Sequence, residues 1–168
     1  ENIYVDLELV LAVDVSSSVD EEEYQLQIRG VGAAFRHPDI IAAIESTGGN
    51  GIAVGMVQWS DNEEQALVGG WYVIKDAADA AEYARIIRRS PRVIASGQTS
   101  IAGALTFSID QINNNNISSS RKVIDVSGDG RANNGVHPMQ IRDIALDQNI
   151  TINGLVIIND EPFLDGYY

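Results

Sequence analysis

The chain has 168 residues, and its 24 acidic and 11 basic side chains give a formal net charge of −13, which argues against nucleic acid and anionic membranes as partners. It contains no cysteine, which excludes disulfides, zinc thiolate sites and thiol nucleophiles. No apolar run approaches the roughly 20 residues of a membrane-spanning helix, and the globular composition predicts a single domain over residues 1–168.

Short apolar runs rich in Val and Ile predict buried strands. The runs are nearly continuous rather than alternating, which is typical of parallel strands that helices cover on both faces. The strongest runs are Leu7–Val13, Ile52–Trp59, Lys122–Val126 and Ile152–Ile158. A weaker run, Ala66–Ile74, contains Gly69-Gly70 and favours an edge strand or a hairpin partner of the run before it.

Amphipathic patterns between these runs predict helices. The first has apolar residues at helical spacing from Tyr24 to Phe35, and Asp20 and Glu23 could form a capping box at its start. Pro38 is expected to stop this helix. Further helices are predicted over Asp76–Arg89, along the stripe Ile101–Ile112 and from Pro138 onward. The alternation of strands and helices predicts a doubly wound α/β fold with a mostly parallel sheet.

Three polar clusters follow predicted strands or open a predicted helix. They are Asp14-Val15-Ser16-Ser17-Ser18, Gly97-Gln98-Thr99-Ser100 and Ser127-Gly128-Asp129-Gly130. In open α/β sheets, ligands bind beyond the carboxyl ends of the strands, near the point where the strand order reverses. Parallel strands would therefore bring all three clusters to one edge of the sheet.

The clusters combine oxygen donors that suit a hard cation. The donors are Asp14, Ser16, Ser18, Thr99 and Asp129, and hard ions such as magnesium, manganese or calcium prefer this chemistry. Two carboxylates about 5 Å apart would repel each other by roughly 3 kcal/mol at an effective dielectric constant of 20. A divalent ion between them would reverse the sign of that interaction, and water or a partner's carboxylate could complete its coordination.

Each cluster also has an ordinary structural explanation. Ser18 or Asp20 could cap the first helix, and Thr99 could cap the third. Asp129-Gly130 could form a turn. These explanations compete with the metal site at each position taken singly, but the occurrence of all three clusters at one predicted edge favours the site.

These residues resemble the metal-ion-dependent adhesion site (MIDAS) of von Willebrand factor type A (VWA) domains. The resemblance is carried by Asp14-x-Ser16-x-Ser18, by Thr99 in a Gly-x-Thr loop and by Asp129 before Gly130. The segment Ser127-Gly128-Asp129-Gly130 departs slightly from the family's usual Thr-Asp-Gly. More narrowly, the chain is similar to bacterial secreted proteins of unknown function that carry this domain.

The resemblance implies a Rossmann-like VWA fold and a non-enzymatic, metal-dependent protein-binding module for adhesion or interaction. Ser16 and Ser18 would bind the ion directly, whereas Asp14, Thr99 and Asp129 would bind it directly or through water. Magnesium is the first candidate, with calcium or manganese as alternatives. An acidic side chain of a protein partner would complete the shell, and the location would be secreted, periplasmic or extracellular. Arg131, Asn133 and Asn134 follow Asp129 on the same edge and are candidate partner contacts.

The end of the chain departs from the family. After Ile158 ten residues remain, fewer than a further helix and strand need, so we expect either an abbreviated fold or a fragment. The loss of those elements would expose a sheet edge and apolar surface, which favours self-association.

Other functions remain open as alternatives. The first is a metal-dependent phosphoryl hydrolase on a similar sheet, although Ser16 stands where such enzymes often carry a second Asp. A serine hydrolase is weaker, because the Gly-x-Ser-x-Gly motif is absent. A third alternative is a structural subunit in which the ion only stabilises the fold.

Overall fold

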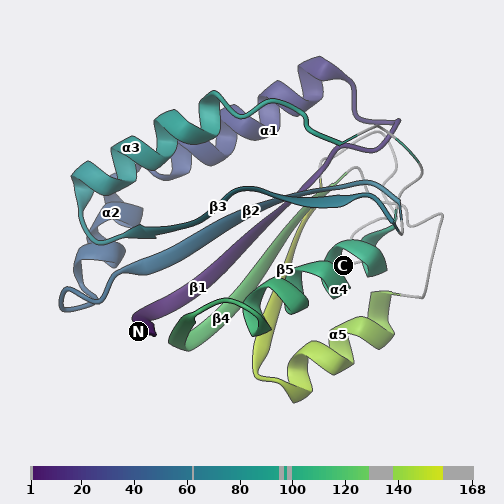
Figure 1. The fold of residues 1–168 in the computed structure, drawn as a ribbon. Helices are drawn as coiled ribbons and strands as arrows, with labels where there is room; N and C mark the ends of the chain where they lie inside the picture. Colours follow the sequence, from purple (N-terminus) through teal and green to yellow (C-terminus); the bar gives the residue numbers. More distant parts are fainter. Residues whose placement is uncertain (1, 62, 95–96, 98–99, 129–137, 157–168) are drawn as a thin grey trace.

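A five-stranded sheet in the order β3-β2-β1-β4-β5 forms the centre of the molecule (Figure 1). The computed structural model describes residues 2–61, 63–94, 97, 100–128 and 138–156. The strands are β1 (Ile3–Asp14), β2 (Ile52–Trp59), β3 (Gln65–Ile74), β4 (Ile117–Gly128) and β5 (Ile150–Val156). β1 pairs in parallel with β2 and β4, and β4 pairs in parallel with β5, whereas β3 runs antiparallel to β2. The predicted mostly parallel sheet is therefore confirmed.

Helices cover both faces of this sheet, as the doubly wound prediction requires. The helices are α1 (Glu21–Ala34), α2 (Pro38–Glu45), α3 (Ala77–Arg88), α4 (Ile101–Asn113) and α5 (Pro138–Asp147). Figure 1 shows α1, α2 and α3 on one face and α4 and α5 on the other. Each face has its own buried apolar cluster, one around Tyr24 and Ile28 and the other around Trp59 and Ile124. Trp59 is thus a packing residue.

The expected stop of the first helix at Pro38 is wrong. α1 ends at Ala34, and Pro38 is instead the first residue of the short helix α2, which the sequence analysis missed. A proline fits this position because the first turn of a helix leaves its backbone N–H groups unpaired in any case. At the other end of α1, Asp20 caps the helix as predicted, since its Oδ1 accepts the Glu23 N–H at 2.8 Å.

The glycine pair in β3 forms a bulge. Gly55 of β2 pairs with Trp71 and the next residue, Met56, pairs with Val68, so Gly69 and Gly70 have no partner in the ladder. Both glycines have positive φ, +75° and +73°, a conformation that other residues adopt only at a cost. β3 is the outer strand beside β2, as the weak run predicted.

The expectation of an abbreviated end falls on residues 157–168, which lie outside the described residues. Among the helices of the described part, none is long and apolar enough to cross a bilayer.

Substitution of Gly51, which lies just before β2, tests whether the fold requires glycine at this position. Its φ is +73°, and a Cβ built there would lie 2.4 Å from the Ile74 carbonyl oxygen. We expect Gly51→Ala to lower the free energy of unfolding by roughly 2–5 kcal/mol, from backbone strain plus steric overlap. Gly48→Ala is the matched control, because φ is +66° there and no atom lies within 4 Å of the added Cβ. It should cost only about 1–2 kcal/mol in urea denaturation; equal losses would contradict the steric argument.

Candidate functional site

The candidate site begins where β1 ends. Asp14 is the last residue of β1, opposite Trp59 of β2, and Val13 is opposite Ser127 of β4. Asp14 and Ser16 have no solvent exposure, whereas Ser18 is exposed. The ends of β1, β2 and β4 therefore form one edge of the sheet, here called the carboxyl edge, and the Asp14–Ser18 loop lies on it with Ser18 toward solvent.

The loop after β1 is held in a tight turn around the Asp14 side chain. The Ser16 N–H donates to Asp14 Oδ1 at 2.7 Å, and the Ser16 and Ser18 hydroxyl oxygens lie 3.3 Å apart. This turn brings the hydroxyls of the two alternate serines within hydrogen-bond distance of each other.

Backbone hydrogen bonds join the segment that precedes α4 to this loop and to the residue after β2. The Ser17 N–H donates to the Gly97 carbonyl at 2.9 Å, and the Ser100 N–H donates to the Ser60 carbonyl at 2.6 Å. A Cβ on Gly97 would lie 3.0 Å from Asp61 Oδ2, so only glycine fits this approach without a shift of its neighbour. Two of the three predicted clusters therefore meet at residues that the structure describes.

Gln27 connects the loop with β4, and the sequence analysis missed it. Its side-chain Nε2 donates to the Asp14 carbonyl at 2.9 Å, and its Oε1 accepts the Ser127 hydroxyl. Gln27 is 9% exposed and lies on the apolar face of α1. An amide on the buried face of an amphipathic helix was the available signal, because buried polar groups need partners.

A second buried amide, Gln58 of β2, holds the segment after α3. Its Nε2 donates to the Tyr24 hydroxyl at 2.9 Å and to the Pro91 carbonyl at 2.7 Å, and its Oε1 accepts the Val93 N–H at 2.8 Å. Burial raises the pKa of Tyr24 to about 12, and the Arg92 guanidinium, 5.7 Å from the ring centroid, partly offsets that rise. The Tyr24 phenol therefore stays protonated near neutral pH.

Arg92 also reaches the loop after β1. Its Nη2 donates to the Val15 carbonyl at 2.7 Å, one residue beyond Asp14. The Val15 N–H in turn donates to the Trp59 carbonyl at 2.9 Å, which extends the pairing of β1 with β2 into the loop. The loop is thus held from α1, from β2 and from the segment after α3.

Five of the predicted site residues lie outside the described part of the chain: Thr99, Asp129, Arg131, Asn133 and Asn134. The expectation that Thr99 caps the helix α4 is wrong, because Ser100 is the N-cap of α4 and its hydroxyl accepts the Gly103 N–H at 3.0 Å. Within the described residues, no three His, Cys, Asp or Glu side chains gather into a metal-binding group. A site here would therefore depend on hydroxyls as much as on carboxylates.

The described donors fit a small divalent cation. Two oxygens bound at right angles to one ion lie about 3.0 Å apart at magnesium distances and about 3.4 Å apart at calcium distances. The 3.3 Å between the hydroxyl oxygens of Ser16 and Ser18 falls in this range. Hydroxyl and carboxylate oxygens are the ligands that such ions prefer.

The strand order and the two helix layers define an α/β domain with a VWA-like fold. The chain belongs to the family described as "Protein of unknown function (DUF1194)", whose sequence profile matches residues 4–168. A comparison with curated proteins finds no match.

Solved structures share this fold at low sequence identity. Proximal thread matrix protein 1 from the mussel byssus is 19% identical, with a TM-score of 0.69 over 91% of this chain and 38% of that chain. A structure of that protein with a zinc-occupied MIDAS motif is 21% identical, with a TM-score of 0.66 over 91% and 38% of the two chains. The pilus adhesin SpaC from Lactobacillus rhamnosus GG, in an open conformation, is 17% identical, with a TM-score of 0.61 over 95% and 25%. The present chain spans less than two fifths of the length of these proteins.

Gln27→Leu tests whether the Gln27 amide stabilises the carboxyl edge. The change leaves the Asp14 carbonyl and the Ser127 hydroxyl without this partner, so we expect it to lower the free energy of unfolding by about 1–3 kcal/mol. Gln25→Leu is the control, because Gln25 only contacts Glu21 on the exposed side of α1, and its effect should stay within about 0.5 kcal/mol. Urea denaturation measures both, and a neutral Gln27→Leu would show that Gln27 does not stabilise the edge.

Proposed function

We propose that this chain is a divalent-cation-dependent protein-binding module. Asp14, Ser16 and Ser18 would hold the ion together with Thr99 and Asp129, and magnesium is the first candidate, before calcium or manganese. The observation that carries this proposal is the pair of hydroxyls of Ser16 and Ser18, 3.3 Å apart, beside the fully buried Asp14. The family resemblance and a zinc-occupied MIDAS motif in a protein of the same fold support it.

The residues of this chain would position the ion rather than react with it. Asp14 supplies negative charge at a position without solvent exposure, where charge interactions are screened less than at the surface. When bound, the ion would supply a positive centre that accepts a carboxylate oxygen from a partner protein. Arg131, Asn133 and Asn134 are proposed to contact that partner, and the resemblance places the module in a secreted, periplasmic or extracellular location.

Metal binding is tested by titration with manganese, followed by electron paramagnetic resonance, and with magnesium, followed by calorimetry. We expect Asp14→Asn to weaken binding at least about tenfold, because it removes a charged ligand while keeping the side-chain size. Asp20→Asn is the matched control: it removes a nearby exposed carboxylate, and asparagine still caps α1. Equal affinities of the wild type and Asp14→Asn would overturn the site.

Stability and activity measurements separate the alternatives. An ion at a hundred times its Kd should raise the free energy of unfolding by about 2.7 kcal/mol, and EDTA should remove this gain. A gain in stability without magnesium-dependent binding of acidic peptides would favour the structural subunit. Hydrolysis of a generic phosphate ester that Asp14→Asn abolishes would favour the phosphoryl hydrolase.

Self-association through the sheet edge is a second proposed contact. β5 is the outer strand of the described sheet on the side away from β3, and an edge strand presents unpaired backbone groups to another copy. We expect concentration-dependent dimers in analytical ultracentrifugation that Thr151→Lys on β5 weakens and Thr106→Lys on α4 leaves unchanged. A monomer at all concentrations would rule this contact out.

A further inference from the structure

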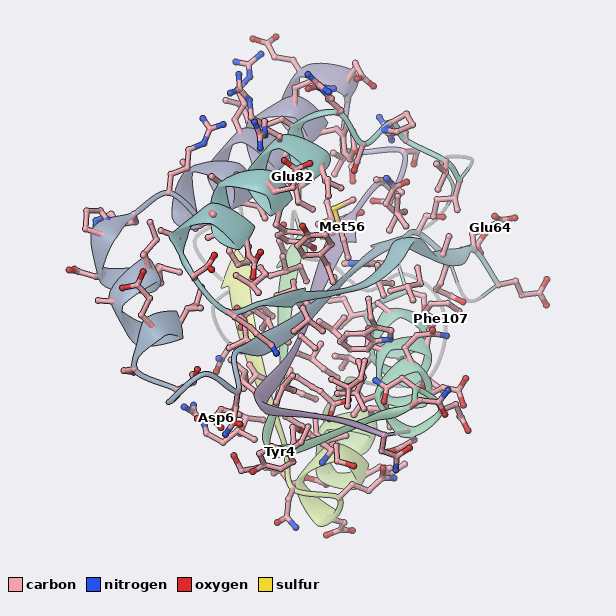
Figure 2. The ribbon with its side chains drawn as sticks, turned by 60° about the vertical axis from the view of Figure 1, so that its left-hand side comes forward. Tyr4, Asp6, Met56, Glu64, Glu82 and Phe107 are labelled. Atoms are coloured by element: carbon pink, nitrogen blue, oxygen red, sulfur yellow. The ribbon has the colours of Figure 1, made fainter. Side chains whose placement is uncertain are left out.

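Arginines gather on one side of an otherwise acidic protein. Arg29 on α1, Arg36 just beyond the end of α1, and Arg85, Arg88 and Arg89 at the end of α3 are all exposed. They are five of the 11 basic residues of the chain. Figure 2 shows nitrogen-bearing side chains clustered over α1 and α3. We call these five residues the arginine seam.

The packing of α1 against α3 brings Arg88 onto the surface of α1. A Cβ built on Gly32 of α1 would lie 3.2 Å from Cγ of Arg88, so the Arg88 stem crosses α1 at this glycine. Arg29 is three residues before Gly32, which places it on the same side of α1, whereas Arg36 lies two residues beyond the end of the helix. Arg85 is three residues before Arg88 and four before Arg89, so the arginines of α3 are also neighbours.

Most of this positive charge has no ion-pair partner on the described part of the chain. Arg85 pairs with Glu82, whereas Arg29, Arg36, Arg88 and Arg89 form no ion pair there. Like charges three and four residues apart on a helix destabilise it. The dipole of α3 favours positive charge in its last turn, and an acidic partner would relieve the remaining repulsion among its arginines.

We propose that the arginine seam is a docking surface for a short acidic segment of a partner protein. The planar guanidinium groups match carboxylates through paired hydrogen bonds, and arginine is enriched in protein interfaces. Ile86, 37% exposed between Arg85 and Arg89, adds apolar contact area. A long polyanion or an anionic membrane would extend beyond the seam and meet the repulsion of a chain with a net charge of −13, whereas a short segment would not.

This surface is distinct from the proposed metal contact and does not require an ion. Its test uses a fluorescently labelled oligoglutamate peptide in EDTA, with binding followed by anisotropy at about 20 and about 150 mM salt. We expect saturable binding that weakens with salt, because the contact is between exposed charges. Binding that appears only with magnesium and is lost in Asp14→Asn would instead belong to the metal site.

Two charge-reversal variants with the same change in net charge test whether the peptide binds at the arginine seam. Arg85→Glu with Arg89→Glu should weaken peptide binding at least about tenfold. Lys75→Glu with Arg121→Glu changes the net charge by the same amount at exposed positions elsewhere and should have little effect. Arg85→Gln with Arg89→Gln serves as a second variant, because glutamates at the end of α3 oppose its helix dipole and could unfold it.

Three results would overturn the proposal. The first is equal weakening of peptide binding in the seam variant and in the control variant, which would show only a net-charge effect. The second is the absence of oligoglutamate binding by the wild type in EDTA. The third is binding of a sulfated oligosaccharide or of phosphatidylglycerol vesicles through Arg85 and Arg89 without binding of the peptide, which would assign the seam to another class of partner.

Discussion

The burial of the Asp14 carboxylate is the constraint on which the carboxyl edge depends. A carboxylate without solvent exposure is unfavourable unless hydrogen bonds or opposite charges compensate it. The loop after β1 turns back, so that the Ser16 N–H donates to Asp14 Oδ1 at 2.7 Å. This turn also brings the hydroxyls of Ser16 and Ser18 together. The buried Asp14 carboxylate, which costs free energy at the end of β1, therefore also brings the oxygen donors together. At the proposed site, a divalent cation would offset the buried charge further.

Much of the fold could be predicted from the sequence because the strands are rich in Val and Ile, and β2 is buried along its whole length. The Ile52–Trp59 run coincides with β2, and the weak run with Gly69-Gly70 predicted the edge strand β3. The bulge at the two glycines was not predicted. The prediction at Pro38 was wrong because proline is compatible both with the end of one helix and with the first turn of the next. At the site, the Asp14–Ser18 loop could be located from its spacing, whereas Gln27 and Gln58 could not be assigned partners, since those partners are distant in sequence. Local patterns predict which residues are buried but not which backbone groups they meet.

Acidic and basic side chains occupy different places along α1. Its first turn carries Glu21, Glu22 and Glu23 next to the loop after β1. Arg29 lies on its exposed side, and Arg36 lies just beyond its end. A strongly acidic chain would repel an acidic partner at long range. Within about 8–10 Å of the surface, where salt screens charges less, the sign of the nearest surface charges determines whether the partner is attracted or repelled. The arginine seam can therefore attract carboxylates although the net charge is −13. The acidic first turn would restrict such a partner to the seam side of the helix.

α1 links the proposed metal contact to the seam. Gln27 on its buried face holds the Asp14 carbonyl, and Arg29 stands two residues further on the exposed flank. The helix is itself fixed by the Tyr24 hydroxyl, which donates to the Ser90 carbonyl at 2.9 Å and accepts from Gln58. The distance between the two contacts is therefore set by packed side chains rather than by a flexible linker. For a partner that carries acidic residues at both points, the first contact would hold the second at a high effective concentration, so two individually weak contacts would act as one strong one.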